Sequence, residues 1–217
     1  MLTELDARLA GGDGPGPWTV ALHGRAGAGK TSVALEYAHR HRAEVGLAWQ
    51  FAAGDRAVLA AGFGQLAAEL DARRIGNAWD AVVSVHRVLA AFPARWLLVF
   101  DDAPDPESVR AFLPPAGDGR VLITSQNREW PADHALEVPV LDPEVAGTFL
   151  ADRTSEPDLH AARELAGELG GLPLALAQAA GYMQATGDSI AVYLTGFRQQ
   201  RQKMLDRGEP SGYRAIA

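Results

Sequence analysis

The sequence predicts an α/β fold, in which helices cover both faces of an open parallel sheet, followed by a small all-α helical bundle. Three observations lead to this prediction. Continuous apolar runs, typical of strands buried on both faces, occur at residues 96–100 and 120–125, and residues 18–24 have the pattern of a further buried strand. Amphipathic helical patterns alternate with these runs up to about residue 140. Beyond that point only helical patterns follow, so we expect a domain boundary there.

The first domain, residues 1–140, begins with a short helix, because Leu2, Leu5 and Leu9 recur at helical spacing. A loop rich in Gly and Pro follows. The last strand is expected at the edge of the sheet, because Pro139 cannot donate to a ladder of hydrogen bonds. The full set of predicted elements is a helix at 3–10, a strand at 18–24, a helix at 31–41, a strand at 46–53, helices at 57–73 and 80–92, and strands at 96–100, 120–125 and 135–140.

The second domain, residues 141–207, is predicted to contain helices alone. They are expected at 142–152, 158–169, 173–186 and 189–205. Residues 208–217 form a tail with no packing pattern of their own.

Composition narrows the class of protein. Hydrophobic residues make up 47% of the 217 residues, which is enough for a packed core and too many for disorder. The formal net charge of −7 gives the whole chain no electrostatic footprint for nucleic acid. The absence of cysteine excludes disulfides, thiolate nucleophiles and cysteine-ligated zinc. With no apolar run of about 20 residues, we expect a soluble, cytoplasmic protein with no membrane partner.

A phosphate-binding motif follows the first predicted strand. Residues 24–31 match G-x-x-x-x-G-K-[ST] without a mismatch, and their Lys30 is one of only two lysines beside eighteen arginines. Its three glycines allow successive backbone N–H groups to turn inward, and the following helix adds the positive end of its dipole. We expect Lys30 to reach the β- and γ-phosphates and Thr31 to place its hydroxyl on Mg²⁺. A chance Gly-rich turn is the alternative, but the strand before it and the helix after it favour nucleotide binding.

Polar residues follow two later strands. Asp101 and Asp102 end an apolar run, where ligands of open α/β sheets bind, so Asp101 is the expected Mg²⁺ partner and Asp102 could polarise the attacking water. The alternative is that the acidic pair simply opens a turn. Thr124, Ser125 and Gln126 end the next strand; they either sense a γ-phosphate or are ordinary polar residues leaving a strand.

Four motifs together resemble the NB-ARC family, the nucleotide switches of STAND ATPases. In order they are HGRAGAGKTSVALEYAHRH, WLLVFDDAPDPESVRAFLP, GRVLITSQNREW and LGGLPLALAQAAGYM. The resemblance implies a P-loop NTPase sandwich of three layers followed by the helical ARC1 bundle. It also implies ATP or ADP as the ligand, slow hydrolysis, and a closed ADP state that opens with ATP.

The resemblance assigns roles to positions of this chain. It implies that Thr31 and Asp101 bind Mg²⁺ and that Pro173 of the GLPL motif packs near the adenine. The catalytic candidates are Lys30, Asp102 and Gln126. The P-loop residues that would bind nucleotide are Gly24, Arg25, Ala26, Gly27, Ala28, Gly29, Lys30, Thr31 and Ser32.

Three departures from the family pattern matter. Many members carry arginine where this chain has Gln126, so a charge-assisted contact to the γ-phosphate would be replaced by a weaker one. This favours an alternative function, a module that holds ADP or ATP with negligible turnover. Residues 208–217 resemble the lead-in to a winged-helix domain, and we expect that domain, the sensor and effector domains, and the family's upstream adenine-contact element to be missing from this chain.

Other functions and partners follow from these expectations. We expect nucleotide as a partner and no nucleic acid for this segment. Self-association that depends on nucleotide would use apolar surface of the helical bundle. A small-molecule kinase on the same fold is a further alternative, although no lid-like arginine cluster supports it.

Overall fold

Residues 1–10, 16–70 and 78–207 are described by the computed structural model, which divides into two units, Met1–Pro139 and Val140–Ala217. Each unit is considered by itself below. Most of the predicted glycine-rich loop, the last residues of the helix predicted at 57–73, and the tail at 208–217 lie outside the described residues.

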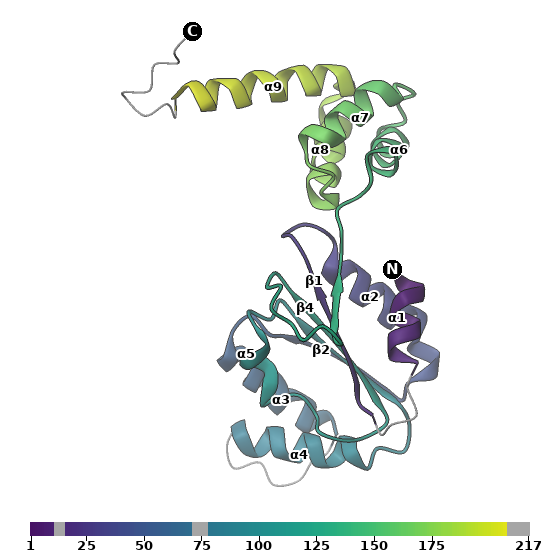
Figure 1. Ribbon diagram of the computed structural model, residues 1–217, viewed down its shortest axis with the longest axis vertical. Helices are drawn as coiled ribbons and strands as arrows, with labels where there is room; N and C mark the ends of the chain where they lie inside the picture. The colour runs from purple at the N-terminus through teal and green to yellow at the C-terminus, as the bar shows by residue number, and fades with distance from the viewer. Residues whose placement is uncertain (11–15, 71–77, 208–217) are drawn as a thin grey trace. The chain divides into compact units, whose positions relative to one another are not determined.

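A parallel sheet forms the centre of the first unit (Figure 1). Its five strands lie in the order β2-β3-β4-β1-β5, and every neighbouring pair is parallel. In chain order the strands are β1 (Trp18–His23), β2 (Leu47–Ala52), β3 (Trp96–Asp101), β4 (Gly119–Ser125) and β5 (Ala135–Glu137). Strand β4 therefore lies between β1, which leads into the predicted phosphate loop, and β3, which carries the predicted acidic pair at its end.

The burial of the strands explains their sequences. All seven residues of β4 and the first five of β3 are buried, as their continuous apolar runs predict for strands covered on both faces. Strand β5 lies at an edge of the sheet, as predicted, but it ends at Glu137. The backbone N–H of Val138 still donates to the carbonyl oxygen of His23, and Pro139, which has no N–H, follows directly.

Helices cover both faces of this sheet, so the unit has three layers, and the predicted α/β class is confirmed. One face packs against α1 (Leu2–Leu9) and α2 (Lys30–Arg40). The other packs against α3 (Arg56–Glu69), α4 (Ala78–Ala90) and the short α5 (Pro106–Arg110). Successive residues of a strand point to opposite faces, and Val121 and Leu122 accordingly enter different cores.

Two short helices were not predicted from the sequence. Helix α5 has only five residues, in a stretch for which the sequence favours a turn as one alternative. Its signals are local: the side chain of Asp105 accepts a hydrogen bond from the backbone N–H of Ser108, and Pro106 is the first helical residue. The 3₁₀ helix η1 (Arg42–Glu44) follows directly after α2.

In its described residues, the second unit contains helices joined by short connections and no strand. It contains α6 (Pro143–Thr154), α7 (Leu159–Glu168), α8 (Pro173–Thr186) and α9 (Ile190–Arg207). The side chains of Asp142 and Asp158 cap the first two helices by accepting backbone N–H bonds. The core between the helices is rich in alanine, and its large members are Leu150, Leu165, Leu176, Met183, Ile190 and Leu194.

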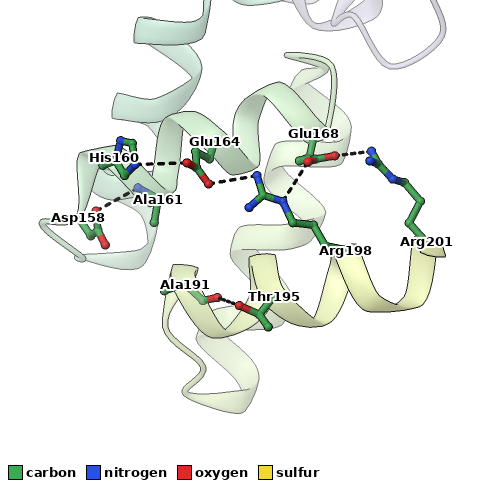
Figure 2. Close-up of polar contacts among 9 residues, drawn as sticks. All are labelled: Asp158, His160, Ala161, Glu164, Glu168, Ala191, Thr195, Arg198 and Arg201. Carbon is green, nitrogen blue, oxygen red and sulfur yellow. Dashed lines mark hydrogen bonds and ion pairs between the residues drawn. The ribbon is translucent and has the colours of Figure 1, made fainter. Parts of the chain in front are cut away.

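A row of charged side chains joins α7 to α9 (Figure 2). Glu164 and Glu168 lie one turn apart on α7, and the guanidinium of Arg198 contacts both, at 3.1 and 3.0 Å. Arg201 makes a second ion pair with Glu168. Partly exposed pairs of this kind contribute little free energy each, so the buried core of this unit, not this row, accounts for most of its stability.

Within the described ranges, no helix is long and apolar enough to cross a lipid bilayer. This agrees with the sequence, which contains no apolar run of the required length.

Candidate functional site at the carboxyl edge of the sheet

The loop between β1 and α2 has a backbone shape that needs glycine. Gly24 has a φ of +149°, and a Cβ added there would lie 2.6 Å from the carbonyl oxygen of Val138. Gly29, with a φ of +94°, is the left-handed residue that precedes the first turn of α2. Both positions therefore exclude ordinary side chains, and they direct the chain from the end of a buried strand into a helix N-terminus. This is the local geometry that an anion-binding loop requires.

Lys30 is the first residue of α2 and only 8% exposed. Its ammonium donates to two carbonyl oxygens of the loop, those of Gly24 at 3.0 Å and Arg25 at 2.9 Å. Burial lowers the pKa of Lys30, and the nearby carboxylates of Asp102 and Asp101 oppose that shift. The loop thus holds a partly desolvated cation against its own backbone, where a phosphate group would meet it.

Asp101, the last residue of β3, receives hydrogen bonds from three elements. The hydroxyls of Thr31 on α2 and Thr124 on β4 both donate to its Oδ1 oxygen, at 2.7 and 2.6 Å. The amide of Gln50 on β2 approaches its Oδ2 oxygen at 3.4 Å. The sheet order explains this convergence, because β2 and β4 are the two neighbours of β3. Asp101 is therefore held in place before any ligand binds.

The donor set at this point fits Mg²⁺. A threonine hydroxyl and a carboxylate are hard oxygen ligands, and they lie 2.7 Å from one another beside a helix N-terminus. In the described parts of the chain, no cluster of three or more His, Cys, Asp or Glu residues could hold a metal alone. A phosphate-binding loop needs no such cluster, since Mg²⁺ at these sites completes its coordination with phosphate oxygens and water.

Asp102 adopts a backbone conformation that is uncommon for a residue with a side chain. Its φ is +61°, in the left-handed region, where Asp is tolerated better than most residues. Its backbone N–H donates to the Thr124 hydroxyl at 2.8 Å, and its carboxylate is exposed at the end of β3. The next residue, Ala103, is held through its N–H by the backbone oxygen of Thr124 and through its carbonyl by the Ser125 hydroxyl. The acidic pair is thus set by β4 as well as by β3.

The structure brings four predicted site residues together, namely Lys30, Thr31, Asp101 and Asp102. Gln126 directly follows β4 and is exposed. Pro173 is the first residue of α8 and belongs to the second unit, whereas the four residues named above belong to the first. In the loop itself, Gly24 and Ala28 are buried, whereas Arg25 and Ala26 are exposed, as is Ser32 in the first turn of α2.

Two contacts of the site are not predicted from the sequence. Gln50 lies in no motif, and it reaches Asp101 only because β2 pairs with β3 in register. Thr124 is predicted only as a polar residue at the end of a strand, with phosphate sensing as one alternative. In the structure its hydroxyl donates to the Asp101 carboxylate. Both contacts depend on the order of the strands, which no local sequence pattern records.

Comparisons with known proteins agree with this architecture. No family model matches the chain. The regulatory protein AfsR of Streptomyces griseus is 30% identical over 223 residues, which cover 94% of this chain and 22% of that protein. The chain therefore spans about a fifth of the length of this relative.

Two solved structures share the fold. The Aeropyrum pernix ORC1 protein, determined in complex with DNA, superposes with a TM-score of 0.60 at 17% identity, covering 96% of this chain and 67% of that one. A signal transduction ATPase with numerous domains (STAND) from Pyrococcus horikoshii, which carries a tetratricopeptide repeat sensor, gives a TM-score of 0.50 at 18% identity, covering 81% and 28%. At these identities the likeness shows the fold alone, which is the three-layer α/β fold of P-loop NTPases.

Proposed function

We propose that this chain is the ATP- and ADP-binding core of a STAND-type signalling switch, which hydrolyses Mg·ATP slowly to reset its conformation. One observation carries the proposal. A glycine-dependent loop with a buried lysine lies beside a helix N-terminus, and the hydroxyl of the next residue, Thr31, is hydrogen-bonded to Asp101 at the end of a neighbouring element. This combination provides both a phosphate cradle and a divalent-metal partner.

Each residue has a defined part in this proposal. The backbone N–H groups of residues 24–31 and the ammonium of Lys30 would bind the phosphates and neutralise their charge. Thr31 and Asp101 would hold Mg²⁺, which when bound spreads the charge of the triphosphate. Asp102, with its exposed carboxylate, would orient the water that attacks the terminal phosphate. Most of the rate enhancement would come from positioning and charge neutralisation.

The finer identity also belongs to the proposal. The four ordered motifs support the NB-ARC group, with the second unit acting as an ARC1-like bundle and Pro173 packing near the adenine. The relative AfsR is a regulatory protein several times longer than this chain, which agrees with a switch core that acts within a larger protein. We further propose a cytoplasmic location, and self-association that changes with the bound nucleotide. Light scattering with ADP and with ATP tests the last point.

The test of the proposal is the release of phosphate from Mg·ATP. We expect slow release by the wild-type chain and a fall of about 100-fold or more in Lys30→Ala, because the cation that neutralises the transferred phosphate is lost. Lys203→Ala is the matched control, since Lys203 is the other lysine of the chain and is exposed. Release that is equal in all three proteins, or that is absent from wild type, would contradict the proposal.

The alternative function is a module that holds nucleotide with negligible turnover. The observation that favours it is Gln126, a neutral side chain at the exposed end of β4. If this residue limits hydrolysis, Gln126→Arg should increase phosphate release, because a cation there would add a charge-assisted contact to the γ-phosphate. Binding of Mg·ATP without release, in wild type and in Gln126→Arg alike, would establish the holding module.

Nucleic acid is not part of the proposed function. The ORC1 structure was determined with DNA bound, but the net charge of −7 gives this chain no overall attraction for phosphate backbones. A binding titration with duplex DNA at low salt tests this: retention of DNA that weakens steeply as salt rises would show that the chain has a basic surface after all.

A further inference from the structure

The sheet order places one hydroxyl between the two halves of the site. Strand β4 lies between β1, which precedes the phosphate loop, and β3, which ends in the acidic pair. In register, Thr124 pairs with Leu22 of β1, and the residue before it, Ile123, pairs with Phe100. The side chain of Thr124 is only 1% exposed, so every polar contact that it makes must be with the protein or a bound ligand.

The bonds of this hydroxyl can be assigned without ambiguity. An ionised carboxylate only accepts hydrogen bonds, so in the 2.6 Å contact with Asp101 Oδ1 the Thr124 hydroxyl is the donor. A backbone N–H only donates, so in the 2.8 Å contact with Asp102 the same oxygen is the acceptor. A threonine hydroxyl has one proton, and that proton is used. It has none left to offer a phosphate oxygen while the bond to Asp101 lasts.

Because one oxygen contacts both acidic residues, it links the side chain of the first to the backbone of the second. The left-handed conformation of Asp102 is set at this link, since its N–H is held where the chain leaves β3. That conformation decides where the Asp102 carboxylate points.

From these contacts we infer that Thr124 is a positioning residue, whose hydroxyl holds the acidic pair in one arrangement and does not sense phosphate. The expected effect of Thr124 on hydrolysis rests on the proposed function. The two hydrogen bonds of its hydroxyl are observed in the structure and do not depend on that function.

The test compares Thr124→Val, which keeps the shape and removes the hydroxyl, with Thr124→Ser, which keeps the hydroxyl. The first measurement is the rate of hydrogen exchange of the Asp102 backbone amide, which NMR records in the protein without nucleotide. We expect exchange to become about tenfold faster or more in the valine variant and to stay within about threefold of wild type in the serine variant. Unchanged exchange in the valine variant overturns the inference, whatever happens to turnover.

The second measurement separates positioning from binding. In the valine variant we expect kcat for phosphate release to fall about 10- to 100-fold, while the Kd for ADP measured without Mg²⁺ stays within about threefold, because Lys30 and the loop between β1 and α2 are untouched. The serine variant should recover kcat. A fall in the affinity for metal-free ADP as large as the fall in kcat, or no fall in kcat, contradicts the inference. If wild type releases no phosphate, the proposed function fails, and the amide exchange still decides the role of the hydroxyl.

Discussion

Asp101 concentrates more contacts than any other charged residue of the candidate site. Its Oδ1 oxygen accepts bonds from the hydroxyls of Thr31 and Thr124, and its Oδ2 oxygen faces the Gln50 amide. These bonds hold the carboxylate in one direction. A fixed direction suits a residue that is proposed to hold a divalent cation beside a triphosphate.

The metal role that we propose for Asp101 predicts a loss of Mg²⁺ dependence in Asp101→Asn. In wild type we expect Mg²⁺ to increase the affinity for ATP by about tenfold or more, whereas in the variant the increase should nearly vanish, because a neutral amide is a poor ligand for a hard cation. Titrations of ATP with and without Mg²⁺ measure this. Asp133→Asn, which changes an exposed carboxylate of the same unit, serves as control, and an unchanged Mg²⁺ effect in Asp101→Asn would refute the assignment.

His86 on α4 predicts how the first unit responds to acid. Its Nε2 atom lies 3.0 Å from the carbonyl oxygen of Phe112, and its ring packs edge-on against Phe63. Burial lowers the pKa of His86, and the bond to the Phe112 carbonyl only partly opposes this. The unfolded chain therefore takes up a proton just below the ordinary histidine pKa of about 6.5, while the folded chain does not. The contribution of His86 to the free energy of unfolding is fully present above that pH, and it decreases as the pH falls towards the lowered pKa.

Urea unfolding at pH 7.5 and pH 5.5 tests this sign. We expect the unfolding free energy of wild type to fall over this interval, and the fall to be smaller in His86→Gln, whose amide can still donate to the Phe112 carbonyl but cannot titrate. His160→Gln, at a side chain that is 88% exposed, should retain the wild-type response. An equal fall in wild type and His86→Gln would show that other groups govern the acid response.

At the scale of the elements, the junction between β3 and β4 depends on one glycine. The indole of Trp96 is fully buried against the start of β4, and a Cβ added at Gly119 would lie 2.2 Å from its ring atoms. The indole N–H also donates to the carbonyl oxygen of Leu89, so the ring cannot simply turn away. Residues of β3, β4 and α4 thus pack against one another at this point.

Gly119→Ala should destabilise the first unit by about 1–3 kcal/mol, because the methyl group overpacks a site that cannot yield. Gly64→Ala is the matched control: Gly64 lies inside α3, and a Cβ there meets nothing within 4 Å. That variant should gain about 0.5–1 kcal/mol from the higher helix propensity of alanine. Chemical unfolding of the three proteins measures both values, and a Gly119→Ala variant as stable as wild type would mean that the ring has room to move.

The elements also show what a sequence can predict here. Buried strands were predictable because burial on both faces produces an unbroken apolar run, as in Trp96–Phe100. The glycine-dependent loop between β1 and α2 was predictable because its motif lies in contiguous residues. The strand order was not, because no local pattern records that β4 lies between β1 and β3. The roles of Gln50 and Thr124 depend on that order, and they emerged only in three dimensions.

At the scale of the whole molecule, the tryptophans report on one unit alone. All five, at positions 18, 49, 79, 96 and 130, lie in the unit Met1–Pro139. Each unit has its own hydrophobic core, so the two can respond differently to a ligand. Tryptophan fluorescence therefore follows the unfolding of the candidate nucleotide-binding unit within the intact chain.

Thermal unfolding followed by tryptophan fluorescence should shift upward in the presence of Mg·ADP. A ligand present at 100 times its Kd stabilises the folded state by about 2.7 kcal/mol, which is enough to move the midpoint by several degrees. Far-UV circular dichroism, which also reports the helical second unit, should show a smaller or divided shift if that unit unfolds separately. The same tryptophan shift in Lys30→Ala would place the nucleotide elsewhere.

The central claim is that phosphate groups bind in the loop between β1 and α2 against Lys30, and calorimetric titration of ADP in Mg²⁺ buffer tests it most directly. The protein is first freed of co-purified nucleotide, and wild type is compared with Lys30→Ala and with the control Lys203→Ala. The account predicts saturable binding with one site in wild type and in the control, and affinity reduced at least about 100-fold in Lys30→Ala. Absence of binding to wild type, or equal affinity in all three proteins, would contradict it.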